Sequence, residues 1–248
     1  MGKPTFESGD CHAAKERRLA MIYGDELSSK TNLYAPGYMY SGTACRPRFL
    51  SAKGDFIHIM NALAPTLSTR HLQDVKPALR DIMLVVVGSL LVAAFAQIAI
   101  PLPFTPVPIT GQTFAVLLVG AALGSKRGAA SLGLYTVEGA IGLPFFAGGK
   151  AGLSGPTIGY LIGFIVAAYF IGLLAERGMD RSLRTSLVPF LVGTVIVYLF
   201  GAGWLVLSLG MSLPAAFAAG VAPFLIGDAI KLLLAGAALP AAWKLVKE

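Results

Sequence analysis

The stretch Pro223–Leu234, PFLIGDAIKLLL, places one acid and one base inside a strongly apolar run of the sequence. Asp228 and Lys231 stand three residues apart, so a helix carries both side chains on one face. Ionisable groups are costly at membrane depth and usually face a bundle interior or a water-filled cavity. The pair therefore predicts either an ion pair that joins two helices or a polar ligand site, with Lys231 as donor and Asp228 as acceptor.

The composition of the whole chain is far from that of a soluble domain. Of its 248 residues, 55% are hydrophobic and 13% are charged, with a mean hydropathy of +0.70. Charged residues make up about 25% of an ordinary soluble domain. The composition predicts a polytopic membrane protein. In that class a net charge of +7 belongs to cytoplasmic loops, so we expect no nucleic-acid partner.

Six apolar runs follow one another from Asp81 onward, separated by loops rich in glycine, proline or charge. The first run ends at PLPFTPVPIT, which predicts an extended external turn because proline cannot continue a helix. We expect an all-α membrane protein with six transmembrane helices, at about 81–100, 111–124, 128–143, 157–175, 187–209 and 218–243.

Basic residues flank these runs unevenly. They precede the first run and follow the second, fourth and sixth, whereas the loops after the first, third and fifth runs contain only Lys150. The positive-inside rule therefore places both termini in the cytoplasm. The basic residues on the predicted cytoplasmic side are Lys76, Arg80, Lys126, Arg127, Arg177, Arg181, Arg184, Lys244 and Lys247.

Residues 1–80 differ from the rest of the chain, because they are polar and contain no apolar run long enough to cross a bilayer. We expect a largely disordered cytoplasmic extension with a short helix near 56–64, and a transmembrane domain over 81–248. Both cysteines and all three histidines lie in the extension. The spans therefore cannot build a zinc site or a histidine-dependent nucleophile from their own side chains.

Two loops share the predicted external side, the proline-rich turn 101–108 and the apolar loop 143–156. Asp228 lies about ten residues into the last run, or about 15 Å along a continuous helix. We expect the loops to close over a pocket whose floor carries Asp228 and Lys231.

Other residues can reach this predicted pocket. Gln112 and Tyr160 stand at the outer starts of two runs, and the loop glycines, among them Gly149, permit close backbone approach. Glu138, near the outer end of the third run, is expected to snorkel to the interface or to pair with Lys150.

From about Asp81 to its end the chain resembles the BioY family, the biotin-binding S components of energy-coupling factor (ECF) transporters. The stretches that carry the resemblance are FTPVPITGQTFAVLLVGAALG, GAIGLPFFAGGKAGLSGPTIGYLIGF and IGDAIK, which occur in the family's order. The resemblance implies a six-helix S-component bundle that captures biotin from outside, under the loops after the first and third spans.

The resemblance also implies site residues. The acid and base of the family's G-D-x-x-K segment fall on Asp228 and Lys231, and its polar glutamine falls on Gln112. Biotin fits such a site chemically, because its ureido ring needs donors and acceptors and its thiophane ring needs an apolar wall, here from Phe145 and Phe146.

Two positions depart from what some members of the family show. An asparagine after the Gly-Gly pair is Lys150 here, and an arginine after the Gly-Tyr pair of the fourth span is Leu161. We expect Lys150 to supply the cation that the valerate carboxylate of biotin needs.

The resemblance further implies a transmembrane T component and two ABC ATPases as partners, in a multi-pass protein of the bacterial plasma (inner) membrane. The chain itself has no G-x-x-x-x-G-K-[ST] phosphate loop. We expect no enzyme and no cofactor, with biotin as the transported ligand, and action alone or as an oligomer stays open. The alternatives are an S component for another vitamin, an intramembrane enzyme that uses Asp228 as an acid–base group, and a ligand-free structural subunit.

Overall fold

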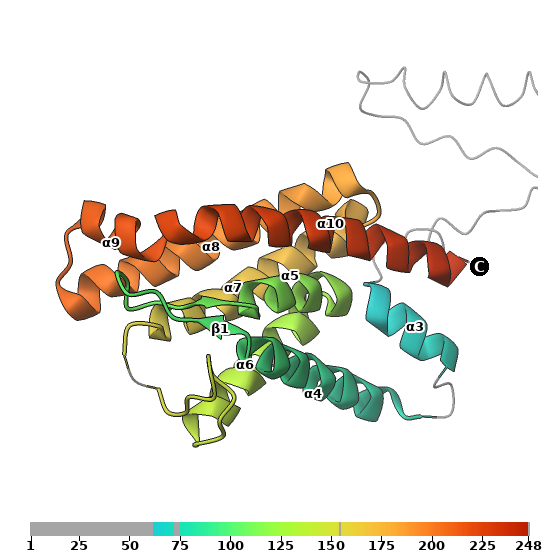
Figure 1. The fold of residues 1–248 in the computed structure, drawn as a ribbon. Coiled ribbons are helices and arrows are strands. Elements are labelled where there is room, and N and C mark those ends of the chain that lie inside the picture. The colour runs from blue at the N-terminus through green and yellow to red at the C-terminus, as the bar shows by residue number, and fades with distance from the viewer. Residues whose placement is uncertain (1–61, 72–74, 154, 248) are drawn as a thin grey trace, which may run out of the picture. The chain divides into compact units, whose positions relative to one another are not determined.

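The computed structural model of the chain describes residues 62–71, 75–153 and 155–247. These residues form a bundle of α-helices with one short β-hairpin (Figure 1). The elements are α3 Leu63–His71, α4 Pro77–Ala96, β1 Ala99–Ile100, β2 Ile109–Thr110, α5 Gln112–Leu123, α6 Ser125–Ala140, α7 Ile158–Leu174, the π-helical turn η1 Ala175–Met179, α8 Leu183–Leu209, α9 Leu213–Gly220, the 3-10 turn η2 Ala222–Phe224 and α10 Leu225–Lys247.

Four helical segments among the described residues are long and apolar enough to cross a membrane: Pro77–Ala96, Ile158–Met179 (α7 with η1), Leu183–Leu209 and Leu213–Lys244 (α9, η2 and α10 up to Lys244). Helices α5 and α6 coincide with the predicted second and third spans but have only 12 and 16 residues. At 1.5 Å per residue α5 is about 18 Å long, which is less than the roughly 30 Å of a bilayer's hydrocarbon core. A helical protein with several candidate spans is confirmed, whereas six complete spans stay a prediction.

The proline-rich turn 101–108 is the loop of a hairpin. Strand β1 pairs antiparallel with β2, with Ala99 opposite Thr110. The extended backbone agrees with the prediction from the prolines. The two-stranded pairing was not predicted, because the expected fold was all-α. Thr105 Oγ1 donates a hydrogen bond to the carbonyl oxygen of Ala219 at 2.6 Å, which ties the loop to the end of α9.

The last apolar run, predicted as a single span over 218–243, is not one continuous helix. Helix α9 ends at Gly220 and α10 begins at Leu225, with η2 between them. Pro223 has no backbone N–H to donate, so a regular α-helical ladder is interrupted there. As a result Asp228 lies in the first turn of α10, and the predicted depth of about 15 Å along one helix does not apply.

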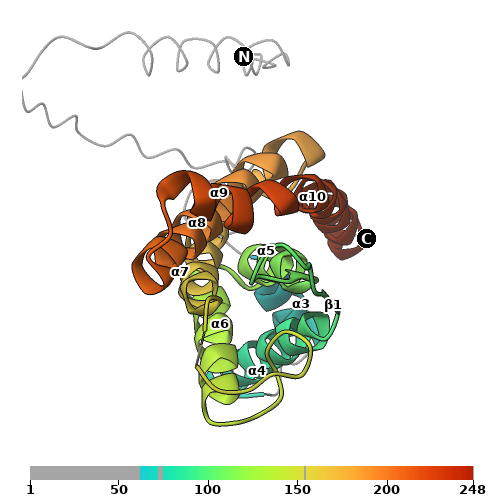
Figure 2. The same ribbon diagram turned by 60° about the vertical axis from the view of Figure 1, so that its left-hand side comes forward.

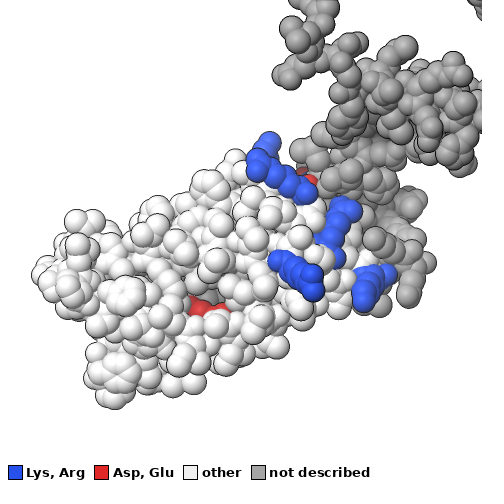
Figure 3. Space-filling view, turned by 90° about the horizontal axis from the view of Figure 1, so that it is seen from above, with Lys and Arg blue, Asp and Glu red and all other residues white. Residues whose placement is uncertain are grey.

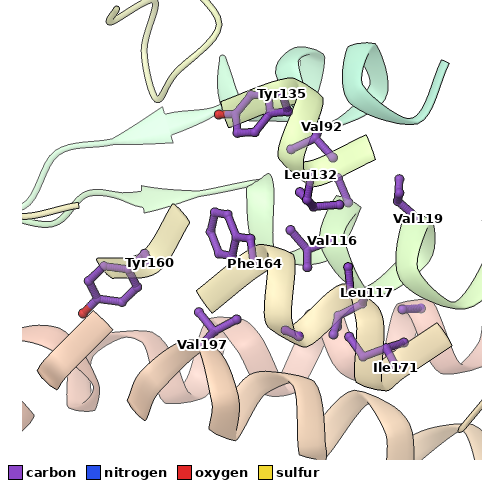
Figure 4. Close-up of a cluster of buried hydrophobic side chains, with 14 of the residues drawn as sticks. Val92, Val116, Leu117, Val119, Leu132, Tyr135, Tyr160, Phe164, Ile171 and Val197 are labelled. Carbon is purple, nitrogen blue, oxygen red and sulfur yellow. The ribbon is translucent and has the colours of Figure 1, made fainter. Parts of the chain in front are cut away.

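Helix α7 lies between α8 and α6 (Figure 2), and it contacts both of them and α5. Glycines make this close packing possible: a Cβ atom on Gly172 would lie 2.3 Å from the backbone carbon of Gly124, and one on Gly163 would lie 3.2 Å from the Cα atom of Val197. Buried apolar side chains fill the remaining space between the helices, as Figure 4 shows around Phe164.

A short helix, α3, falls inside the segment predicted to be a polar extension. It contacts α4, α5 and α10, and its first residue, Leu63, is buried in the core. The helix predicted near 56–64 lies mostly outside the described residues. The described part of the bundle thus begins before the predicted boundary at residues 80 and 81.

Candidate functional site

A cavity with an empty volume of about 580 Å³, part of which is open to solvent, lies between the hairpin, α5, α7, α8 and the start of α10. Five of the residues predicted for the site line this cavity: Asp228, Lys231, Gln112, Tyr160 and Phe146.

The predicted acid and base form an ion pair, with 2.8 Å between Lys231 Nζ and Asp228 Oδ1. Lys231 Nζ also donates to the carbonyl oxygen of Thr110 at 2.8 Å and to Thr113 Oγ1 at 2.9 Å. An ammonium group has three N–H donors, so these three acceptors use all of them. The side chains are 18% exposed for Lys231 and 7% exposed for Asp228, which leaves the pair at the wall of the cavity.

Two further side chains hold Asp228, and sequence reasoning missed both. Tyr198, on α8, donates from its hydroxyl to Asp228 Oδ2 at 2.7 Å. Thr113, on α5, donates to Asp228 Oδ1 at 2.9 Å. The carboxylate is therefore fixed by groups from α5, α8 and its own helix. Two features of the sequence could have indicated them. Tyr198 carries a hydroxyl inside an apolar run, and Thr113 directly follows Gln112.

Gln112 belongs to a second polar network beside the ion pair. Its side-chain Nε2 donates to the hydroxyl of Tyr135, which in turn donates to the carbonyl oxygen of Phe145 at 3.2 Å. Its Oε1 accepts from Thr110 Oγ1 at 3.0 Å. An amide nitrogen carries two N–H groups, so Gln112, which lines the cavity, has one donor beyond the one that it gives to Tyr135.

Tyr160 and Phe146 supply the more apolar part of the lining. The Tyr160 hydroxyl donates to the carbonyl oxygen of Gly220 at 2.7 Å, and its ring faces the cavity wall. Phe146 is buried and packs edge-on against Tyr135, with 5.5 Å between the ring centroids. Of the two residues predicted to form the apolar wall, Phe146 lines the cavity and Phe145 does not, and the ring of Tyr160 adds to the wall.

The structure does not bring Lys150 and Gly149 into the cavity lining. Lys150 is exposed, and its carbonyl oxygen accepts from the backbone N–H of Phe146 at 3.0 Å. The geometry therefore gives no support to the prediction that Lys150 supplies a cation to the ligand. Glu138 is half-buried and its Oε2 has no hydrogen-bond partner among the described residues, so its predicted pairing with Lys150 is not formed.

The fold and the cavity together define a class: helical proteins with several candidate membrane spans and a cavity lined by polar groups between the helices. The BioY family model matches residues 65–248, which is most of the chain. The chain belongs to the BioY family.

Individual relatives agree with this assignment. The biotin transporter BioY of Rhizobium etli is 35% identical over 137 residues, which cover 51% of this chain and 73% of that protein. The biotin transporter BioY of Thermotoga maritima is 41% identical over 126 residues, covering 50% and 72%. Among solved structures, the S component for biotin of an ECF-type ABC transporter matches with a TM-score of 0.62 and 27% identity, over 67% of this chain and 92% of that chain. The resemblance read from the sequence is confirmed.

Proposed function

We propose that this chain binds biotin and mediates its uptake across a membrane as the substrate-specific subunit of an ECF-type transporter. It is a transport protein and not an enzyme, and biotin is its cargo, not a cofactor. The observation that carries the proposal is the family match over residues 65–248 together with named biotin transporters at 35–42% identity. A cavity with a polar wall and an apolar wall supports it.

The chemistry of the cavity fits the two ring systems of biotin. Asp228 Oδ2 accepts one hydrogen bond, from Tyr198, and keeps lone pairs for a ureido N–H. The second N–H of Gln112 can donate to the ureido oxygen. Phe146 and Tyr160 offer aromatic faces to the thiophane ring and to the methylene chain.

We also propose six membrane-spanning segments with both termini in the cytoplasm of a bacterium. The order of the helices supports this topology, and so does the charge distribution: Figure 3 shows Lys and Arg gathered at one end of the viewed face. A membrane-impermeant thiol reagent applied from outside should spare a cysteine at Lys126 and modify one at Lys150. Labelling of both positions, or the reverse pattern, would contradict the orientation.

The transport energy comes from partners in this proposal. A membrane T component and two ABC ATPases supply it, in keeping with the solved relative, which is the S component for biotin of an ECF-type ABC transporter. The chain carries no phosphate loop of its own. Transport by the chain alone or as an oligomer is the alternative.

Biotin binding to the purified protein in detergent tests the proposal. Wild type should bind biotin, and Asp228→Asn and Lys231→Met should each weaken binding by tenfold or more, about 1.4 kcal/mol. Each substitution removes a partner and leaves the other group of the pair buried without it. Tyr198→Phe, which removes a single hydrogen bond to Asp228, should weaken binding by a smaller factor.

Competition with riboflavin and thiamine is the matching specificity control. A folded wild-type protein that ignores biotin but binds another vitamin would assign the same fold to a different cargo. Unchanged biotin affinity in both Asp228→Asn and Lys231→Met would remove the ion pair from the binding site.

A further inference from the structure

We propose that the cavity holds the ligand's acyl tail without pairing its carboxylate to a side-chain cation, so that uncharged amides and esters of biotin are also ligands. The inference rests on the proposed function and deepens it, because it defines which part of the ligand the site recognises. It follows from the charges and the hydrogen-bond donors that line the cavity.

The described cavity lining contains one basic and one acidic side chain, Lys231 and Asp228. They contact each other at 2.8 Å, so the wall carries no net charge. The two other N–H donors of Lys231 form hydrogen bonds with Thr110 and Thr113. A ligand carboxylate could reach this ammonium only by displacing Asp228 or by placing a second carboxylate beside it, and like charges at such a site are unfavourable.

The glycine-rich loop beside the cavity offers little to an anion either. The backbone N–H groups of Gly148, Gly149 and Gly152 donate to the carbonyl oxygens of Ala96, Phe146 and Gly139, at 2.8–3.1 Å. Lys150, the basic residue of this loop, is exposed and does not line the cavity. Figure 3 shows the Lys and Arg side chains of that face at one end of the molecule, apart from the hollow in which an acidic side chain is visible.

These contacts give the ligand an orientation. The ureido ring, which needs both acceptors and donors, lies against Asp228 and Gln112, where both remain available. The acyl tail then points away from the ion pair. Because the cavity is partly open, the carboxylate can keep its water. A hydrated carboxylate contributes little to affinity, so replacing it with a neutral group of similar size costs little.

Competition binding measures this directly. Detergent-solubilised wild-type protein is titrated with biotin, biotin amide and biotin methyl ester against one labelled biotin. The dissociation constants of the amide and the ester should lie within about fivefold of that of biotin. Lys150→Met should leave the affinity for free biotin unchanged, as should Lys126→Met, a matched loss of an exposed lysine at the other end of α6 from the loop.

The outcomes separate the two proposals. Tight biotin binding with an amide and an ester that are more than about fivefold weaker would overturn this inference and leave the proposed function standing. A selective loss of affinity for the free acid in Lys150→Met would overturn it as well, because it would identify a cation for the carboxylate. Failure of folded wild type to bind biotin at all would overturn both.

Discussion

Asp180 is a buried acid at the other end of the bundle, between the candidate spans. It is 0% exposed, its Oδ2 accepts from Trp243 Nε1 at 2.6 Å, and its Oδ1 has no hydrogen-bond partner among the described residues. The Arg181 guanidinium lies 4.5 Å from the centroid of the Trp243 ring. Burial raises the pKa of Asp180 above its ordinary value, and the hydrogen bond from Trp243 and the charge of Arg181 oppose this shift only in part.

This raised pKa predicts a pH-dependent stability. The pKa of Asp180 is higher in the folded than in the unfolded state, so its ionisation favours unfolding. The contribution of Asp180 to the free energy of unfolding is therefore most favourable below the unfolded pKa, near 3.8. It is lost as the pH rises through the pKa of the folded state. Asp180→Asn keeps an acceptor for Trp243 and removes the charge. Its thermal midpoint in detergent should exceed that of wild type near neutral pH, with the difference shrinking toward about pH 4.

A matched control is Asp81→Asn. Asp81 forms a half-exposed ion pair with Arg127 at 2.9 Å, and such pairs contribute about 0–1 kcal/mol. For a chain of this size 1 kcal/mol corresponds to about 2–4 °C in the thermal midpoint, so Asp81→Asn should lower the midpoint by no more than that. If the thermal midpoint of Asp180→Asn equals that of wild type at every pH, ionisation of the buried Asp180 carboxyl group does not destabilise the fold.

At the scale of single residues, the sequence predicts contacts that form within one helix. The spacing of Asp228 and Lys231 puts them on one face of any helix, and the ion pair forms. The partners from other helices, Tyr198 and Thr113, depend on how α5 and α8 pack, which no local pattern encodes. Lys150 was placed in the site by its neighbours in sequence, but its loop turns it outward.

At the scale of elements, the contact between α7 and the turn from α5 to α6 depends on a missing side chain. A Cβ atom on Gly172 would lie 2.3 Å from the backbone of both Gly124 and Ser125. Because backbone atoms cannot rotate away, Gly172→Ala should push the helices apart and cost about 1–3 kcal/mol of unfolding free energy. Thermal unfolding in detergent should show a midpoint lower by several degrees.

Gly133 on α6 provides the comparison. A Cβ atom there meets nothing within 4 Å, so Gly133→Ala should be neutral or stabilising by up to about 1 kcal/mol, through helix propensity. Equal midpoints for the two alanine variants would mean that the close approach of α7 to the turn does not limit stability.

The element boundaries show where hydropathy is a sufficient guide. Long apolar runs locate α4, α7 and α8 to within a few residues, because membrane helices must satisfy their own backbone hydrogen bonds. The break between α9 and α10 was missed, since hydropathy is continuous across it, although Pro223 shortly after Gly220 was an available signal. Helix α3 was missed at its true position because LAPTLSTRH has no strong apolar period.

For the whole molecule, the family could be predicted because its motifs occur from the first external loop to the last span, whereas the packing of α3 on the bundle could not. The predicted boundary at 80 and 81 rests on the first apolar run. The family match begins at residue 65, and α3 packs on α4, α5 and α10. Contacts of this kind arise only once the bundle has formed, and a polar composition does not reveal them.

We therefore propose that the domain begins near residue 62, and that two truncations distinguish this start from the predicted one. A chain that begins at Ala62 should keep the thermal midpoint and the biotin affinity of the full chain. A chain that begins at Pro77 loses α3 and with it the burial of Leu63, worth about 1.5–3 kcal/mol for one large apolar side chain. Its midpoint should fall by several degrees while the cavity residues, all beyond residue 100, stay in place. If instead the two truncated chains unfold at the same temperature, α3 is dispensable and the functional domain starts at the first apolar run.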